Sequence, residues 1–87
     1  MLINNENLNK LLNHLKQYLT VKRYEGEHEI YYVIPKFKTP VMLKQRKAPT
    51  VTGEYEMSLI GKPADVVALV EVIKDTVGVK IVRWWYY

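Results

Sequence analysis

The chain has 87 residues, of which 48% are hydrophobic and 25% charged, and its net charge is +4. This composition is typical of a folded globular protein and excludes a disordered chain. Because there is no cysteine, disulfides, thiolate catalysis and cysteine-ligated zinc are excluded as well.

We expect residues 1–87 to form one domain, because a single core of about 50–200 residues is the usual size. No apolar run approaches the roughly 18 residues that a membrane span requires. The first residues also lack the basic and then apolar pattern of a signal peptide. By elimination, we expect a cytoplasmic protein that does not contact a membrane.

The first 19 residues predict an amphipathic helix. Asn4 is a favourable N-cap, because its side-chain oxygen can accept a hydrogen bond from a free amide of the first turn. The apolar stripe has the spacing of a helix buried on one side. It consists of Leu8, Leu11, Leu12, Leu15, Tyr18 and Leu19. We therefore expect this helix to pack on the rest of the domain.

The next segments predict a hairpin. A first strand covers Thr20 to Tyr24, Gly26 supplies the turn, and a second strand covers Ile30 to Ile34. Both sides of the second strand are apolar, which is typical of a strand inside a sheet or of one with a binding surface. Pro35 ends it, because proline has no amide proton for a strand ladder.

Residues 36–49 allow two interpretations. Val41 to Leu43 can form a short edge strand, because prolines and lysines on either side are usual at sheet edges. A mobile loop is the alternative. A longer strand is then expected from Thr50 to Ile60, with Gly53 as a bulge.

The last third of the chain predicts a helix followed by a strand. Pro63 suits the first helical position, where its missing amide proton costs nothing, and Gly78 suits the helix end. The stripe expected to be buried is Val66, Leu69, Val70, Ile73 and Val77. Val79 to Tyr87 is expected to be the final strand.

These elements predict an α+β two-layer sandwich in the order α-β-β-(β)-β-α-β. The sheet would be antiparallel or mixed, with about four or five strands, and both helices would cover one face. The other face would then meet solvent or a partner.

Catalysis has little support in the sequence, and we expect neither enzymatic activity nor a cofactor. His14 lies beside the polar side of the first helix, where histidines are usually only solvated. His28 stands between Glu27 and Glu29, but alternate residues of a strand point to opposite faces and do not converge on a metal. Ser58 has no histidine or acid at a suitable spacing for a nucleophilic triad. We therefore expect no metal site and no catalytic residue.

The positive charge is concentrated in residues 36–47, which contain no acidic residue. The other eight basic residues are outnumbered by nine acidic ones, so this segment supplies the whole excess. Cations on an extended hairpin or loop can follow a phosphate backbone. The predicted nucleic-acid-binding residues are Lys36, Lys38, Lys44, Arg46 and Lys47. DNA and RNA both remain open, and a solvated lysine-rich edge is the simpler explanation.

The C-terminal aromatic cluster supports a second hypothesis. Large aromatic side chains lie on both faces of the last predicted strand, and helices on one side cannot cover them all. The predicted interface residues are Trp84, Trp85, Tyr86 and Tyr87. Because Trp and Tyr are enriched at interfaces, the alternative function is a homodimer or a regulatory protein-interaction module.

Overall fold

The computed structural model describes residues 1–35 and 39–77 of the chain. Two helices and five strands follow one another in these ranges. They are β1 (Leu2–Ile3), α1 (Asn5–Tyr18), β2 (Lys22–Glu25), β3 (Glu29–Ile34), β4 (Val41–Arg46), β5 (Tyr55–Ile60) and α2 (Pro63–Val77). The strand expected over Val79 to Tyr87 lies outside the described residues.

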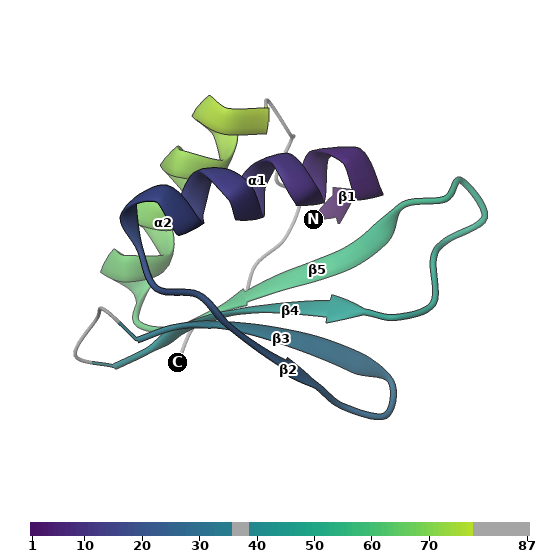
Figure 1. Cartoon of the computed structure of the whole chain (residues 1–87), viewed down its shortest axis with the longest axis horizontal. Helices are drawn as coiled ribbons and strands as arrows, with labels where there is room; N and C mark the ends of the chain where they lie inside the picture. Colours follow the sequence, from purple (N-terminus) through teal and green to yellow (C-terminus); the bar gives the residue numbers. More distant parts are fainter. Residues whose placement is uncertain (36–38, 78–87) are drawn as a thin grey trace.

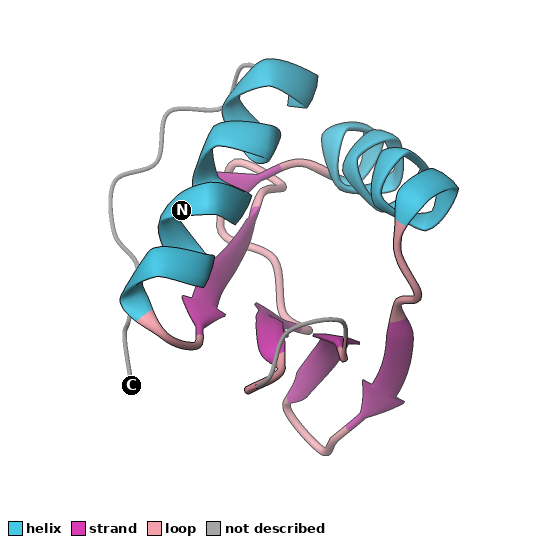
Figure 2. Ribbon diagram, turned by 90° about the vertical axis from the view of Figure 1, so that its left-hand side faces the viewer, coloured by secondary structure: helices cyan, strands magenta, loops and turns pink. Residues whose placement is uncertain are grey.

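The five strands form one antiparallel sheet in the order β1-β5-β4-β3-β2. Both helices lie on the same side of this sheet and contact each other (Figures 1 and 2). The predicted α+β two-layer sandwich is therefore confirmed. The layers enclose one hydrophobic core, built from the helix stripes and from alternate residues of β3, β4 and β5.

Helix α1 begins as the sequence predicts. The Asn4 side chain accepts a hydrogen bond of 2.7 Å from the Asn7 amide, which satisfies a first-turn donor. The four leucines of the stripe inside the helix are buried. Tyr18 was expected in the stripe, but its side chain is 74% exposed. It is the last helical residue, and its ring lies 5.4 Å from the His14 ring instead of entering the core.

Strand β4 is the largest correction to the sequence-based prediction. Residues 41–46 form the central strand of the sheet, neither an edge strand nor a loop. Val41, Leu43 and Gln45 point into the core and are buried. The two prolines lie beyond both ends of the strand, so neither removes a hydrogen bond from its ladder.

Strand β5 begins later than expected. Residues 51–53 turn before it, and Gly53 has a φ of 80°, which a residue with a side chain adopts only with strain. Gly53 therefore belongs to the turn and is not a strand bulge. Met57 and Leu59 point into the core from β5.

The short strand β1 was not expected from the sequence. Leu2 and Ile3 pair with Glu56 and Tyr55 of β5. The pairing continues at Met1, whose nitrogen donates to the Met57 carbonyl and whose carbonyl accepts from the Met57 amide, both at 2.8 Å. The start of the chain is thereby tied to the edge of β5.

Helix α2 covers the remaining part of the core-facing side. Val66, Leu69, Val70 and Ile73 are buried as predicted, whereas the side chain of Val77 lies outside the described part of the structure. No helix in residues 1–35 and 39–77 combines the length and the apolar character that a membrane crossing requires.

Candidate functional site

The sheet face opposite the helices carries a row of polar and aromatic side chains. Tyr24 of β2 is the Cα partner of Tyr31 in β3, Tyr31 is the partner of Lys44 in β4, and Lys44 is the partner of Ser58 in β5. Neighbours along each strand point the other way, because side chains alternate between the two faces. Tyr32, for example, is buried in the core. The row therefore crosses the face that carries no helix.

The two tyrosines form the aromatic part of this face. Directly opposite residues of an antiparallel pair have Cβ atoms roughly 4.5–5.5 Å apart, so the side chains of Tyr24 and Tyr31 leave the sheet at adjacent points of this face. Tyr24 is 54% exposed and Tyr31 is half-buried. A Cβ added at Gly26 would lie 3.4 Å from Cε2 of Tyr31, so glycine leaves room for this ring beside the turn. We name Tyr24 and Tyr31 the tyrosine pair.

The structure separates the predicted basic residues. Lys44 and Arg46 lie on the same face as the tyrosine pair, two residues apart on β4. Lys47 forms an ion pair with Glu25. Glu25 is the Cα partner of Ile30, which packs against the core, so the Glu25 side chain lies on the helix-covered face of the sheet. The other members of the predicted sites lie outside the described residues. They are Lys36, Lys38, Trp84, Trp85, Tyr86 and Tyr87.

Each described cation of the predicted segment has an acidic partner. Lys44 Nζ lies 3.1 Å from Glu29 Oε2, and Arg46 Nη1 lies 3.6 Å from Glu56 Oε2. Lys47 Nζ lies 3.2 Å from Glu25 Oε2. Residues 36–47 contain no acid, so these carboxylates come from strands β2, β3 and β5. The positive charges of residues 44, 46 and 47 are therefore offset by acidic residues of other strands, although no acidic residue lies near them in the sequence.

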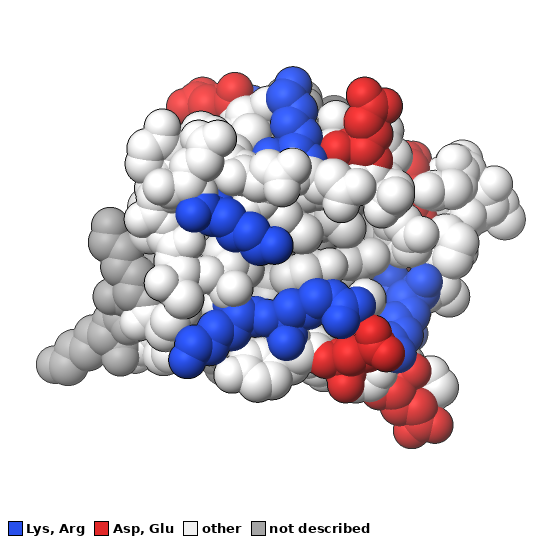
Figure 3. Space-filling view, in the orientation of Figure 1, with Lys and Arg blue, Asp and Glu red and all other residues white. Residues whose placement is uncertain are grey.

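Lys22 was not among the predicted site residues. It is exposed on β2, two residues before Tyr24 and on the same face, and it forms no ion pair within the described part of the chain. Figure 3 shows Lys and Arg side chains gathered over β2, with acidic side chains toward the β2–β3 turn. The spacing of Lys22 and Tyr24, two residues apart in a predicted strand, indicates that both side chains lie on one face of the sheet. The sequence alone does not show that this face is the one without helices.

A second charged group lies on the helix side of the hairpin. Arg23 Nη2 donates to Glu25 Oε1 at 2.9 Å, and Lys47 approaches the other oxygen of that carboxylate. Hydrogen bonds from Arg23 and then Lys47 lower the pKa of Glu25 below its usual value of 4.5. The hydrogen bond to Glu25 in turn raises the pKa of Arg23. The cluster stays charged at neutral pH and ties β2 to the end of β4.

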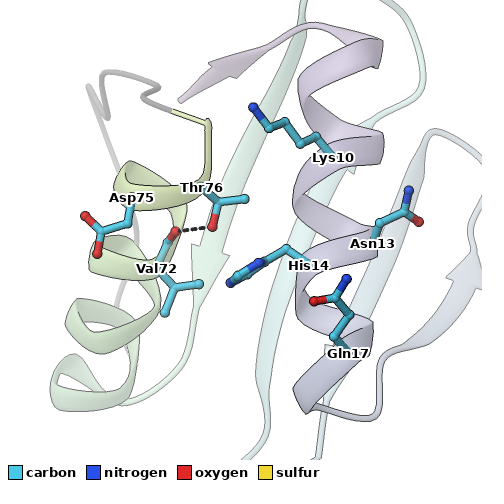
Figure 4. Close-up of a pocket in the computed structure, with 7 residues that line it drawn as sticks. All are labelled: Lys10, Asn13, His14, Gln17, Val72, Asp75 and Thr76. Carbon is cyan, nitrogen blue, oxygen red and sulfur yellow. Dashed lines mark hydrogen bonds between the residues drawn. The ribbon is translucent and has the colours of Figure 1, made fainter.

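A shallow groove lies between the two helices. Figure 4 shows His14 pointing from α1 toward Val72 and Thr76 of α2, while the Asp75 carboxylate points away from it. The Thr76 hydroxyl donates to the Val72 carbonyl at 2.7 Å, so it is engaged by its own helix. Within the described residues, the only recorded interaction of His14 is with the Tyr18 ring. Among the described residues that line the groove, none forms a hydrogen bond or an ion pair with His14.

The acidic hairpin turn does not assemble a metal site either. His28 lies 3.7 Å from Glu27, and both side chains are strongly exposed, whereas Glu29 is turned to Lys44. In residues 1–35 and 39–77, no three His, Asp or Glu side chains are grouped as metal ligands.

Comparison of the chain with protein families, curated proteins and solved structures finds no match. The open sheet face combines the tyrosine pair with three cations, Lys22, Lys44 and Arg46.

Proposed function

We propose that this protein is a non-catalytic module that binds single-stranded nucleic acid on its open sheet face. The observation that carries the proposal is the tyrosine pair, bordered on the same face by Lys22, Lys44 and Arg46. Stacking of a base on an aromatic side chain contributes about 1–3 kcal/mol. Two rings on one face can each stack a base, and the cations that border them on this face can contact the phosphates between the bases.

The aromatic rings favour a single strand over a duplex. In a duplex the faces of the bases are stacked on one another and are not accessible to side chains. Unpaired bases can be spread over a sheet and stacked on its aromatic residues. Since every base has a π-face, this mode of binding tolerates many sequences and accepts either DNA or RNA.

Lys44 and Arg46 can exchange their carboxylate partners for phosphates at low cost. The side chains of Lys44 and Glu29 are 36% and 27% exposed, and those of Arg46 and Glu56 are 67% and 58% exposed. Ion pairs exposed to this degree contribute only about 0–1 kcal/mol. Lys22 has no such partner to give up. With three phosphate contacts, log K should fall with log salt with a slope of about −2, because each contact to a single strand contributes about −0.7.

Fluorescence anisotropy with labelled oligo-dT and oligo-U at low salt tests the aromatic part of this site. We expect Tyr24→Ala to weaken binding by about five- to 150-fold, the equivalent of losing one stacked base. Tyr18→Ala is the matched control, because Tyr18 is an even more exposed tyrosine on α1, on the other side of the sheet. It should bind like the wild type. No binding by the wild type, or equal losses in the two variants, would contradict the proposal.

The same titrations at several salt concentrations test the cations. We expect Lys22→Gln to reduce the steepness of the salt dependence by about 0.7 for both oligonucleotides, since one phosphate contact is removed. Lys10→Gln is the control, because Lys10 is exposed on α1 and has no ion pair within the described residues. A salt dependence that is unchanged by Lys22→Gln would place the phosphates elsewhere.

Three expectations from the sequence remain predictions beside this proposal. They are the absence of catalysis, a cytoplasmic location, and a homodimer or regulatory contact through the cluster at residues 84–87. The last of these concerns residues outside the described part of the structure.

A further inference from the structure

Strand β2 forms one edge of the sheet. It pairs with β3 on one side, and no other described strand pairs with it. All four residues of β2 are exposed. An exposed edge strand presents free amide and carbonyl groups, which are a template for pairing with another strand.

The backbone register shows which groups of β2 face outward. The Gly26 amide donates to the Glu29 carbonyl at 2.7 Å, so the backbone of residue 26 faces β3. Backbone groups alternate in direction along an antiparallel strand, and Lys22 and Tyr24 therefore also face β3. The amide and carbonyl groups of Arg23 and Glu25 point to the free edge.

The side chains of β2 are complementary to those of a second β2. Arg23 and Glu25 lie on one face, two residues apart, with Tyr24 between them on the other face. We propose that β2 pairs antiparallel with β2 of a second copy of this chain, with Tyr24 opposite Tyr24 and Arg23 opposite Glu25. Four backbone hydrogen bonds would join the outward groups of Arg23 and Glu25 in the two copies.

Other registers of the same pairing are unfavourable. A shift of two residues one way brings Arg23 opposite Arg23, and the same shift the other way brings Glu25 opposite Glu25. Like charges directly opposite each other are destabilising. A shift by an odd number of residues is excluded, because it would place the outward backbone groups of one copy opposite residues of the other copy whose groups face β3. The proposed register is the one that matches both charge and backbone direction.

The symmetry of this pair has a consequence for the open face. A two-fold axis perpendicular to the sheet places both helical layers on one side and both open faces on the other. Tyr31, Tyr24, Tyr24 and Tyr31 of the two copies would then form one row of four rings. A role of this row in binding nucleic acid rests on the proposed function, whereas the pairing itself does not.

The pairing is expected to be weak and to depend on concentration. β2 is only four residues long, and its opposite-charge and aromatic cross-strand pairs contribute roughly 0.2–1 kcal/mol each. Sedimentation velocity without nucleic acid, from about 20 μM to about 1 mM protein, covers the range of such an equilibrium. We expect the average sedimentation coefficient of the wild type to rise with concentration toward that of a dimer.

Charge reversal tests the proposed register. Arg23→Glu places two carboxylates opposite each other at both ends of the pair, and this variant should sediment as a monomer over the whole range. The double variant Arg23→Glu/Glu25→Arg restores opposite charges and should regain association. Lys74→Glu is the matched control, since Lys74 is exposed on α2, a helix that lies away from β2, and this variant should associate like the wild type. Failure of the double variant to regain association would contradict the register.

Arg23→Pro tests the backbone contacts. Its missing amide proton faces the free edge, so the β2–β3 ladder keeps its hydrogen bonds and circular dichroism should match that of the wild type. We expect this variant to be monomeric. Association that persists in both Arg23→Pro and Arg23→Glu, or a wild type that is monomeric up to about 1 mM, would overturn the proposal. Neither result depends on nucleic-acid binding, so this proposal can fail without the first.

Discussion

Tyr32 and Gln45 form a polar contact inside the apolar core. The Tyr32 hydroxyl donates to Gln45 Oε1 at 3.0 Å, and the two residues are only 6% and 5% exposed. A buried polar group costs little while it is hydrogen-bonded and much more when its partner is removed. This bond lets β3 and β4 bury a glutamine in the core.

Tyr32→Phe removes the hydroxyl and leaves the Gln45 oxygen buried without its donor. We expect the free energy of unfolding to fall by about 1–3 kcal/mol. Tyr31→Phe is the matched control, because the Tyr31 hydroxyl is on the open face and lies 3.5 Å from Glu29, a long contact. Urea denaturation of both variants measures the difference. Equal stabilities would show that the buried bond contributes nothing beyond the exposed one.

The acidic partners of the basic segment could not be predicted from the sequence. Glu29 is fifteen residues from Lys44 along the chain, but a neighbour across the strands in space. Only the register determines such pairs, and register depends on the whole sheet. The N-cap at Asn4, by contrast, was predictable because its hydrogen bond is local.

At the scale of elements, local patterns predicted most of the secondary structure. Helical periodicity identified α1 and α2, and alternation identified β3 and β5. The predicted edge position of β4 was wrong. Prolines and lysines near a strand indicate a sheet edge only if they interrupt the hydrogen-bond ladder of that strand. Here they lie beyond its ends or point to the open face. Two-residue strands such as β1 carry too little pattern to be predicted at all.

The central position of β4 predicts a large effect of truncating its core side chain. Leu43 is 0% exposed, and Leu43→Ala should lower the free energy of unfolding by about 2–5 kcal/mol. Met42→Ala is the control on the same strand, since Met42 is half-buried on the opposite face and should cost less. Thermal or urea denaturation compares the two. A loss below about 1 kcal/mol for Leu43→Ala would be typical of a strand that covers no core.

At the scale of the whole molecule, the two faces of the sheet have different roles. The helix-covered face supplies the core, and the open face carries the tyrosine pair with Lys22, Lys44 and Arg46. The layered architecture was predictable from the order of elements. The site was predictable only in part, because cations were visible in the sequence whereas their neighbours across strands were not. Tyr24 and Lys22 of β2 join Tyr31 and Lys44 on this face only through the hairpin register.

We propose that the open face binds single-stranded nucleic acid. Titration of the isotope-labelled protein with a short oligo-dT or oligo-U, followed by NMR, locates the binding surface residue by residue. We predict that the largest shifts of backbone amide and tyrosine ring signals occur at Lys22, Tyr24, Tyr31, Lys44 and Arg46. Shifts confined to the groove between α1 and α2, or no shifts at low salt, would contradict the claim.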